Sequence, residues 1–414
     1  MGDRRGRGRM LGVATAALAL VVPFGGAPAH AAPRPVPAAF FGMHDTRLAT
    51  GGFPSVPTGS VRLWDVGCTW RDVQPARTKW AFGCLDRAVA NARSHRSRAL
   101  VVLGLTPAWA AADRRAPGVY GPGTSSPPKS LALWRAYVTK VVQRYRGTVD
   151  YQVWNEPNIP AFWSGSPAQM VRLEEETARI VGRYAPRATL VGPSLATRRG
   201  SQLVWLRRYA AAGGGRTVDA IGLHLYPAPT AGPEASIALL GQARRMLAAR
   251  GISKPVWCTE LNYGASFGPA GSPPVGYSAA RASAYVARAF VLAAQNGVAR
   301  VFWYGWDTPG TSGIAMSRGG VPTRAATAYA RVRSWLLGSR MDGCSVDRSG
   351  TYTCRMLLKD RSPARVMWNP ERAVRVRTPS STRTTTPLSG TVTRESGART
   401  LRVGGTPVLI RTAR

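Results

Sequence analysis

The sequence predicts a (β/α)8 barrel that is followed by a small all-β domain. Between about residues 37 and 338, short runs with β propensity alternate with amphipathic helical stretches. Several of these runs are continuous in Val, Ile, Leu and Phe, as in parallel strands that are buried on both faces. Such βα units repeated over about 300 residues fit a barrel, whose usual size is ~250 residues before insertions.

The candidate barrel strands are short apolar runs spread evenly along this region. They are Ala39–Met43, Ser60–Trp64, Ala99–Leu105, Val149–Trp154, Thr189–Gly192, Ala220–Leu225, Pro255–Thr259 and Val301–Tyr304. Apolar residues at helical spacing predict helices between them, at Leu131–Arg146, Gln169–Tyr184, Ser236–Arg250 and Ala279–Asn296. A doubly wound open sheet is the competing architecture. No Gly-x-Gly-x-x-Gly follows the first strand, which weakens the dinucleotide-binding version of that sheet.

The chain changes character near Met341. From there, short β-like runs are separated by polar turns such as Thr378–Pro387. The runs are Thr351–Leu358, Ala364–Trp368, Val374–Arg377, Gly390–Thr393 and Thr400–Val403. Residues 341–414 are too apolar at these runs for a disordered tail, so we expect a small β-domain there, after a barrel over 37–338.

Residues 1–31 have the organisation of a secretory signal peptide. A basic amino-terminal segment precedes an apolar run from Leu11 to Val22, and the small residues Ala29 and Ala31 offer a cleavage site. The apolar run is shorter than the about 20 residues that a bilayer span needs. We therefore expect a secreted protein whose mature chain has no membrane span.

The composition is strongly basic, with a formal net charge of +36. Arginine carries almost all of this charge, and the arginines are scattered along the predicted helices rather than gathered in one arm. Nucleic-acid binding needs a concentrated basic patch or helix, so it is not expected. A basic adhesion protein remains an alternative, and it predicts binding that collapses when salt is added.

Five cysteines in an exported chain suggest disulfide bonds. Cys344 and Cys354 flank a turn-like segment and could staple a hairpin, and Cys68 and Cys84 fall in one loop region and could also pair. Cys258 lies within an apolar run, so we expect a buried thiol. The sequence has no Cys-x-x-Cys pair and no His-x-x-His cluster, and neither a metal site nor a cofactor is expected.

Two apolar strands that run into a glutamate are the most informative features of the sequence. Glu156 follows the strand in Tyr-Gln-Val-Trp-Asn-Glu-Pro-Asn, and Glu260 ends the strand in Val-Trp-Cys-Thr-Glu-Leu. Burying an unpaired carboxylate costs several kcal/mol, whereas barrel enzymes place their active sites at this end of the strands. Two carboxylates in one cleft suit glycoside hydrolysis, in which one donates a proton and the other stays ionised.

The segments Trp154–Asn158 and Thr259–Glu260 resemble the fourth- and seventh-strand motifs of glycoside hydrolase clan A. The resemblance covers about residues 37–338 and is closest to family 39, with families 5 and 79 as neighbours. It implies that Glu156 is the general acid/base and Glu260 the nucleophile of a retaining enzyme, with carboxyl groups ~5–5.5 Å apart. The tail is shorter than the extended β-sandwich common in family 39 xylosidases, which argues against xylan-derived substrates.

The resemblance also implies contacts around the two glutamates. Asn155 would bond the sugar 2-hydroxyl, and Arg62, near the end of the second strand, would keep Glu260 ionised. His224 and Tyr226 point to the same side of the sixth strand by the period of two. The Tyr226 hydroxyl would then donate to the nucleophile.

Aromatic and histidine side chains at strand ends are further candidates for substrate binding. Trp303 and Trp306 end the eighth strand and would stack on the apolar face of a sugar, with Trp306 favoured because it lies nearer the loop. His44 ends the first strand and is expected to line the pocket. Rim candidates from the loops are Trp109, Tyr120, Phe162 and Trp163, any of which could instead pack the core.

The function that we predict is that of a secreted retaining glycosidase acting on an oligo- or polysaccharide, at a β-linked O-glycosidic bond. The alternative from another class is a non-catalytic secreted carbohydrate-binding protein that keeps the barrel. A binding protein has no need for both glutamates, which favours the enzyme.

Overall fold

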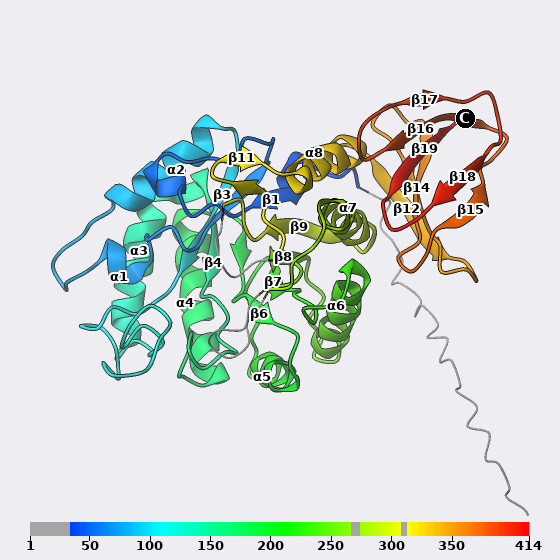
Figure 1. Cartoon of the computed structure of the whole chain (residues 1–414). Coiled ribbons are helices and arrows are strands. Elements are labelled where there is room, and N and C mark those ends of the chain that lie inside the picture. The colour runs from blue at the N-terminus through cyan, green and yellow to red at the C-terminus, as the bar shows by residue number, and fades with distance from the viewer. Residues whose placement is uncertain (1–33, 266–273, 308–312, 414) are drawn as a thin grey trace, which may run out of the picture. The chain divides into compact units, whose positions relative to one another are not determined.

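A computed structural model (Figure 1) describes residues 34–265, 274–307 and 313–413 of the chain. Residues 34–414 form one compact unit. The predicted signal peptide, residues 1–31, lies outside the described residues, as does part of the loop after the predicted seventh strand. In the described part of the chain, no helix combines the length and the hydropathy needed to cross a membrane.

A nine-stranded, wholly parallel sheet forms the centre of the fold. Its strands are β1 (Phe41–Met43), β2 (Ser60–Leu63), β3 (Arg98–Leu103), β4 (Asp150–Val153), β5 (Leu190–Val191), β6 (Leu195–Ala196), β7 (Ile221–His224), β8 (Val256–Leu261) and β9 (Val298–Trp303). Their spatial order is β5-β4-β3-β2-β1-β9-β8-β7-β6. Every predicted barrel strand therefore contributes to this sheet.

The two edge strands of the sheet, β5 and β6, follow one another directly in the chain. Gly192, Pro193 and Ser194 separate them, and a proline cannot donate a ladder hydrogen bond. β5 pairs with β4 and β6 pairs with β7, while isolated bridges join Asn155 to Ser194 and Val191 to Ala220. The sheet thus curls, and these isolated bridges link its two edge regions across the interruption. The predicted run Thr189–Gly192 found β5 but not β6.

α-Helices follow every strand position except the first. They are α1 (Trp70–Val73), α2 (Gly83–Ser94), α3 (Leu131–Tyr145), α4 (Pro167–Tyr184), α5 (Gly200–Ala211), α6 (Pro233–Ala248), α7 (Ala279–Gln295) and α8 (Arg324–Leu336). The link from β1 to β2 holds only a 3-10 turn, Leu48–Thr50. The four predicted helices are confirmed as α3, α4, α6 and α7. The start of α4 is fixed by a capping box between Ser166 and Gln169, with Pro167 in the first turn.

Side chains of the sheet pack on two sides. Leu100, Val191, Ala220, Trp257 and Phe302 come from strands all around the curl and form a small cluster inside it. A much larger apolar cluster lies between the sheet and the helices. Because side chains alternate along a strand, Phe302 faces the interior and its neighbours Val301 and Trp303 face the helices.

The C-terminal region is all-β, as predicted. An antiparallel sheet has the order β12-β13-β14-β19-β16-β17, and β15 pairs with β18 in a separate ribbon. The strands are β12 (Arg340–Val346), β13 (Tyr352–Leu357), β14 (Pro363–Trp368), β15 (Val374–Arg377), β16 (Thr382–Pro387), β17 (Thr393–Arg394), β18 (Thr400–Val403) and β19 (Val408–Thr412). The prediction of a turn over Thr378–Pro387 is wrong, because Thr382–Pro387 pairs with β19 at the centre of the sheet. A short hairpin, β10 (Ser317–Arg318) and β11 (Val321–Pro322), precedes α8.

Both anticipated cysteine pairs form disulfide bonds. Cys68 and Cys84 join the segment after β2 to the start of α2, with Cα atoms 5.6 Å apart. Cys344 and Cys354 lie opposite each other on β12 and β13. Cys258 is a free, buried thiol on β8, as expected.

Candidate active site

The two glutamates lie at the carboxyl ends of the parallel strands. Glu260 is part of β8, and Glu156 follows β4. Four residues at this edge have left-handed backbone: Asp65 with φ 60°, Leu105 with φ 62°, Trp154 with φ 57° and Glu156 with φ 43°. Such conformations are unfavourable for residues other than glycine, and they tend to cluster at functional sites.

Arg62 on β2 is the hub of the polar network. Its side chain is fully buried, and each of its three nitrogens donates to a different acceptor. Nη1 donates to Glu260 Oε1 at 2.6 Å, Nη2 to Asn155 Oδ1 at 2.6 Å and Nε to Gln152 Oε1 at 2.8 Å. A guanidinium suits this role because its donors form a rigid planar fork and its charge is permanent.

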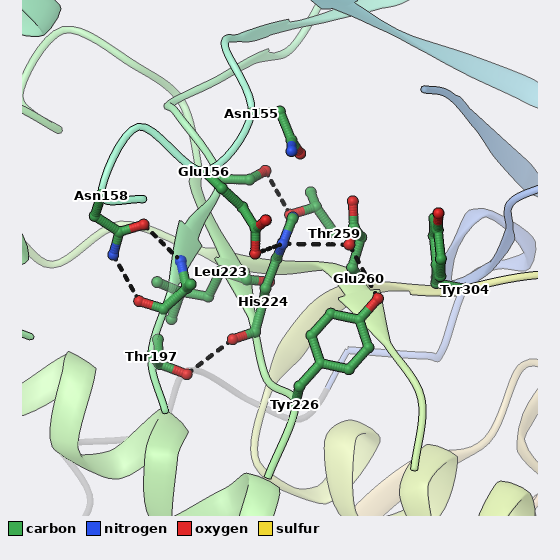
Figure 2. A network of polar contacts seen from close by, with 12 residues as sticks. Asn155, Glu156, Asn158, Thr197, Leu223, His224, Tyr226, Thr259, Glu260 and Tyr304 are labelled. Carbon is green, nitrogen blue, oxygen red and sulfur yellow. Dashed lines mark hydrogen bonds and ion pairs between the residues drawn. The ribbon is translucent and has the colours of Figure 1, made fainter. Parts of the chain in front are cut away.

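Glu260 is held by donors on both of its oxygens. Arg62 binds Oε1, and the Tyr226 hydroxyl donates to Oε2 at 2.9 Å (Figure 2). Burial raises the pKa of this carboxyl, and the charge of Arg62 opposes that rise. Charge-assisted hydrogen bonds of this kind favour the ionised form and fix the carboxylate in one orientation.

Glu156 lies in a different environment. The guanidinium of Arg62 binds Glu260 and not Glu156, whose side chain is 14% exposed. Burial raises the pKa of Glu156 to about 7; Arg62 opposes this rise, and the carboxylate of Asp65 adds to it. A carboxyl with such a pKa is about half protonated at neutral pH, so it can act as a general acid there.

His224, the last residue of β7, lies between the two glutamates (Figure 2). Its Nδ1 is 2.9 Å from Glu156 Oε1 and 3.4 Å from Glu260 Oε2. Burial lowers the pKa of His224 to about 3, so the ring is neutral at neutral pH. The ring proton is assigned to Nδ1, because the carboxylate oxygens beside this nitrogen accept hydrogen bonds. The buried Nε2 has no hydrogen-bond partner.

The donor atoms of Glu156, His224 and Glu260 lie within 4.8 Å of one another. Within the part of the chain that the structure describes, these three residues are the group whose spacing would suit a cation. Glu260 already has the guanidinium of Arg62 as its counter-charge. A site that works without metal therefore stays our prediction.

Six of the residues singled out in the sequence come together here: Arg62, Asn155, Glu156, His224, Tyr226 and Glu260. His44 lies close by, with Nε2 3.0 Å from the carbonyl oxygen of Thr259 and its ring against Tyr304. Its side chain is 1% exposed, so it lies beneath the site rather than at the surface of a pocket.

The two predicted stacking tryptophans do not join this group. Trp303 is fully buried on the outer face of β9, where it packs against Phe290 of α7 and Tyr263. Trp306 is 1% exposed and belongs to the apolar cluster outside the sheet. Both rings have the surroundings of core residues.

Tyr304 and Asp65 occupy the position where aromatic contact was expected. Figure 2 shows Tyr304 beside Glu260. Its hydroxyl donates to Asp65 Oδ2 at 2.7 Å, and the Tyr120 hydroxyl donates to the other oxygen of Asp65. Tyr304 was predictable in principle, because side chains alternate along a strand and Tyr304 lies two residues after Phe302, which faces the interior. Asp65 and Gln152 had no comparable signal.

The remaining loop aromatics pack against the barrel. Trp109 packs on Trp70, and its indole donates to a backbone carbonyl. Trp163 packs edge-on against the ring of Trp154. Phe162 and Tyr120 lie against Trp64, so of these four residues only Tyr120 reaches the polar network.

Comparisons with known proteins match part of this chain to glycoside hydrolases. Residues 135–329 match the family model "Glycosyl hydrolase catalytic core". A β-xylosidase from Geobacillus stearothermophilus is 32% identical over 124 residues, which is 28% of this chain and 24% of that protein. Both matches are to glycoside hydrolases, and each covers less than half of this chain. The matched part spans only about a quarter of the curated relative's length.

Solved glycoside hydrolase structures share the fold over almost the whole chain. A family 39 glycoside hydrolase from Bacteroides cellulosilyticus WH2 has a TM-score of 0.66 and 18% identity, covering 92% of this chain and 81% of its own. A family 39 β-xylosidase from Caulobacter crescentus has a TM-score of 0.64 and 16% identity, with 93% and 98% covered. With 93% of this chain covered, the fold shared with that β-xylosidase extends into the C-terminal β region.

Proposed function

We propose that the protein is a secreted retaining glycoside hydrolase that cleaves a β-linked O-glycosidic bond by double displacement. The observation that carries the proposal is the pair Glu156 and Glu260, whose oxygens approach within 4.8 Å and of which Glu260 alone is bonded to Arg62. Retaining enzymes need carboxyl groups about 5–5.5 Å apart, whereas inverting enzymes leave room for a water at about 6.5–9.5 Å.

In the first step, Glu260 attacks the anomeric carbon while Glu156 protonates the departing glycosidic oxygen. The product is a covalent glycosyl ester of Glu260. In the second step, Glu156, now ionised, removes a proton from water, which attacks the anomeric carbon and releases Glu260. Arg62 and Tyr226 support this assignment, because their hydrogen bonds hold Glu260 in its anionic form.

Asn155 and His224 are proposed to position the reacting groups. Arg62 fixes the amide oxygen of Asn155, which leaves the amide N–H groups of Asn155 as donors for the 2-hydroxyl of the sugar. His224 would donate to Glu156 when that carboxyl is ionised, between the two steps. Tyr304, rather than Trp303 or Trp306, is proposed to contact the sugar ring.

The substrate proposal follows the relatives. The relative that is similar in sequence is a β-xylosidase, and the solved structures with a similar fold include a β-xylosidase and a glucosidase. We therefore propose a neutral β-xyloside or β-glucoside as the substrate. The site would be built on a (β/α)8 barrel over residues 37–338 that closes at the interrupted fifth strand. The two disulfides and the predicted leader support secretion.

The test is hydrolysis of a panel of aryl β-glycosides and plant polysaccharides by the purified mature protein. Glu260→Gln and Glu156→Gln are assayed beside it, since each removes one carboxylate and keeps the side-chain size. Turnover of one sugar that is lost in Glu260→Gln supports the proposal. Binding of a panel member without any turnover by the unaltered protein would instead favour the non-catalytic carbohydrate-binding protein.

A further inference from the structure

A polar cavity lies away from the two glutamates, where α6 and α7 meet the C-terminal sheet. Its volume is about 740 Å³, within the range of small-ligand pockets. It is lined by the loop before α6, by the first turns of α6 and α7, and by the C-terminal region at Tyr352, Glu371 and Gly405. Figure 1 shows α7 beside β12, at this junction.

The cavity has a built polar wall. Arg288 of α7 has a side chain that is only 5% exposed, and it forms a two-pronged ion pair with Glu234 of α6. Glu234 also accepts a hydrogen bond from the indole of Trp368 at 2.9 Å, which ties the C-terminal sheet to the pair. The ion pair with Glu234 uses Nε and Nη2 of Arg288, and Nη1 takes no part in that pair.

Small residues keep this wall accessible. A Cβ atom at Gly232 would lie 3.2–3.5 Å from Glu234, Arg288 and the hydroxyl of Tyr285. Alanines line much of the rest of the cavity, at positions 231, 235, 280 and 284. With only small residues at these positions, the side chain of Glu234 stays 21% exposed and that of Arg288 5% exposed.

Aromatic rings and balanced charge indicate the kind of ligand. Tyr352 stacks on the buried Trp368 with one face, at 4.8 Å between centroids, and it remains partly exposed to the cavity. Tyr285 also lines the cavity, and the guanidinium of Arg288 lies over its ring. The exposed Arg281 and Glu371 carry opposite charges, and the Arg288–Glu234 pair is neutral. Aromatic faces with neutral donor and acceptor pairs suit a polyhydroxylated ring better than an anion.

We propose that this cavity is a second carbohydrate-binding site, which holds a neutral oligosaccharide segment of the polymer that the active site cleaves. The loop that carries Tyr226 of the active site continues to residues 230–232 of the cavity wall, so both sites open toward the carboxyl ends of the strands. The inference rests on the proposed function for the identity of the polymer. Binding at the second site does not require turnover.

The experiment compares variants in binding and in turnover. Ala280→Arg places a long side chain into the cavity, and Ala279→Arg adds the same charge one residue away, outside the cavity lining. Tyr352→Ala removes the aromatic platform. Each variant is tested for retention on insoluble xylan and on cellulose at about 1 M NaCl, where the Debye length of ~3 Å suppresses attraction through the basic surface. Each is also assayed on the aryl glycoside that the unaltered protein turns over best.

We expect Ala280→Arg to weaken retention by about tenfold because the new side chain occupies the cavity. Tyr352→Ala should weaken retention as much, because one stacked ring is lost. Ala279→Arg should bind as the unaltered protein does, and all three should keep aryl-glycoside turnover. Equal retention by Ala280→Arg and Ala279→Arg would overturn the second site. Failure of the proposed function would give a different result: the unaltered protein would turn over none of the aryl glycosides.

Discussion

Replacing Arg62 with methionine is the most revealing change at the active site. The substitution keeps most of the side-chain volume and removes three hydrogen bonds, to Glu260, Asn155 and Gln152. It also removes the positive charge that lies 2.6 Å from the proposed nucleophile. Glu260 is 6% exposed, so water cannot replace the lost partner.

The magnitude follows from leaving a buried carboxylate unpaired. Removing one partner of a buried ion pair costs about 3–5 kcal/mol, and one pKa unit corresponds to about 1.4 kcal/mol. Tyr226 still donates to Glu260, which favours the lower end of that range. We therefore expect the pKa of Glu260 to rise by about two units and kcat/KM at neutral pH to fall about 100-fold.

The assay is the pH dependence of kcat/KM on an aryl glycoside. The acid limb should move to higher pH because Glu260 now needs a higher pH to ionise. The basic limb should move the same way, since Arg62 also lowers the pKa of Glu156 in the unaltered protein. Arg62→Lys is the matched control, because it keeps the positive charge and loses the planar set of guanidinium donors. Its activity should fall, but the pH dependence of kcat/KM should shift much less than in Arg62→Met.

An Arg62→Met protein that stays folded, retains kcat/KM within about threefold and keeps its acid limb would refute the reasoning. That result would mean that the ionisation of Glu260 does not depend on its closest cation.

Three further changes test other parts of the site and fold. Burial raises the pKa of Glu156 from 4.5 to about 7, so the unaltered protein loses stability as pH rises through about 7. Glu156→Gln should therefore increase the free energy of unfolding at pH 8 by at most about 3 kcal/mol, and much less at pH 4. The Tm measured at the two pH values checks this. Asp65→Asn should move the basic limb of kcat/KM to lower pH, because the Asp65 charge raises the pKa of Glu156; an unmoved limb would contradict this coupling. Replacing Cys68 and Cys84 together by serine should cost about 3 kcal/mol in urea unfolding, as expected for a bridge that spans 16 residues; a loss of less than about 1 kcal/mol would contradict the assignment.

The glutamates were predictable because a charge at the end of an apolar strand conflicts with its surroundings. Such a conflict has few structural explanations, and both Glu156 and Glu260 end buried strands. His224 and Tyr226 followed from the alternation of side chains along β7. Arg62 and Asn155 were identified only through the resemblance to clan A.

The tryptophans were misassigned because alternation along a strand predicts which residues share a face, but not which face points into the barrel. Trp303 and Tyr304 are neighbours, and only the face on which Phe302 lies decides which of them enters the site. An aromatic residue on the outer face of a barrel strand packs equally well against a helix, as Trp303 does against Phe290. Proximity to the loop, which favoured Trp306, says nothing of the direction of its side chain.

The strands β6 and β16 were missed for local reasons. β6 has only two residues and follows Pro193, so no run of apolar residues marks it. β16 consists of threonines, an arginine and a proline, a composition that also suits a polar turn. Pairing with β19 decides its structure, and such pairing between segments distant in sequence is not visible in local composition.

The most direct test of the central claim is to identify the residue that becomes glycosylated. The protein is incubated with activated 2-deoxy-2-fluoro β-glycosides, which slow the second step and trap a glycosyl–enzyme ester, and the labelled peptide is sequenced by mass spectrometry. We predict one sugar per chain, attached to Glu260, and no label in Glu260→Gln. A label on another carboxylate, or hydrolysis of the parent glycoside with inversion of configuration and no label at all, would contradict the account.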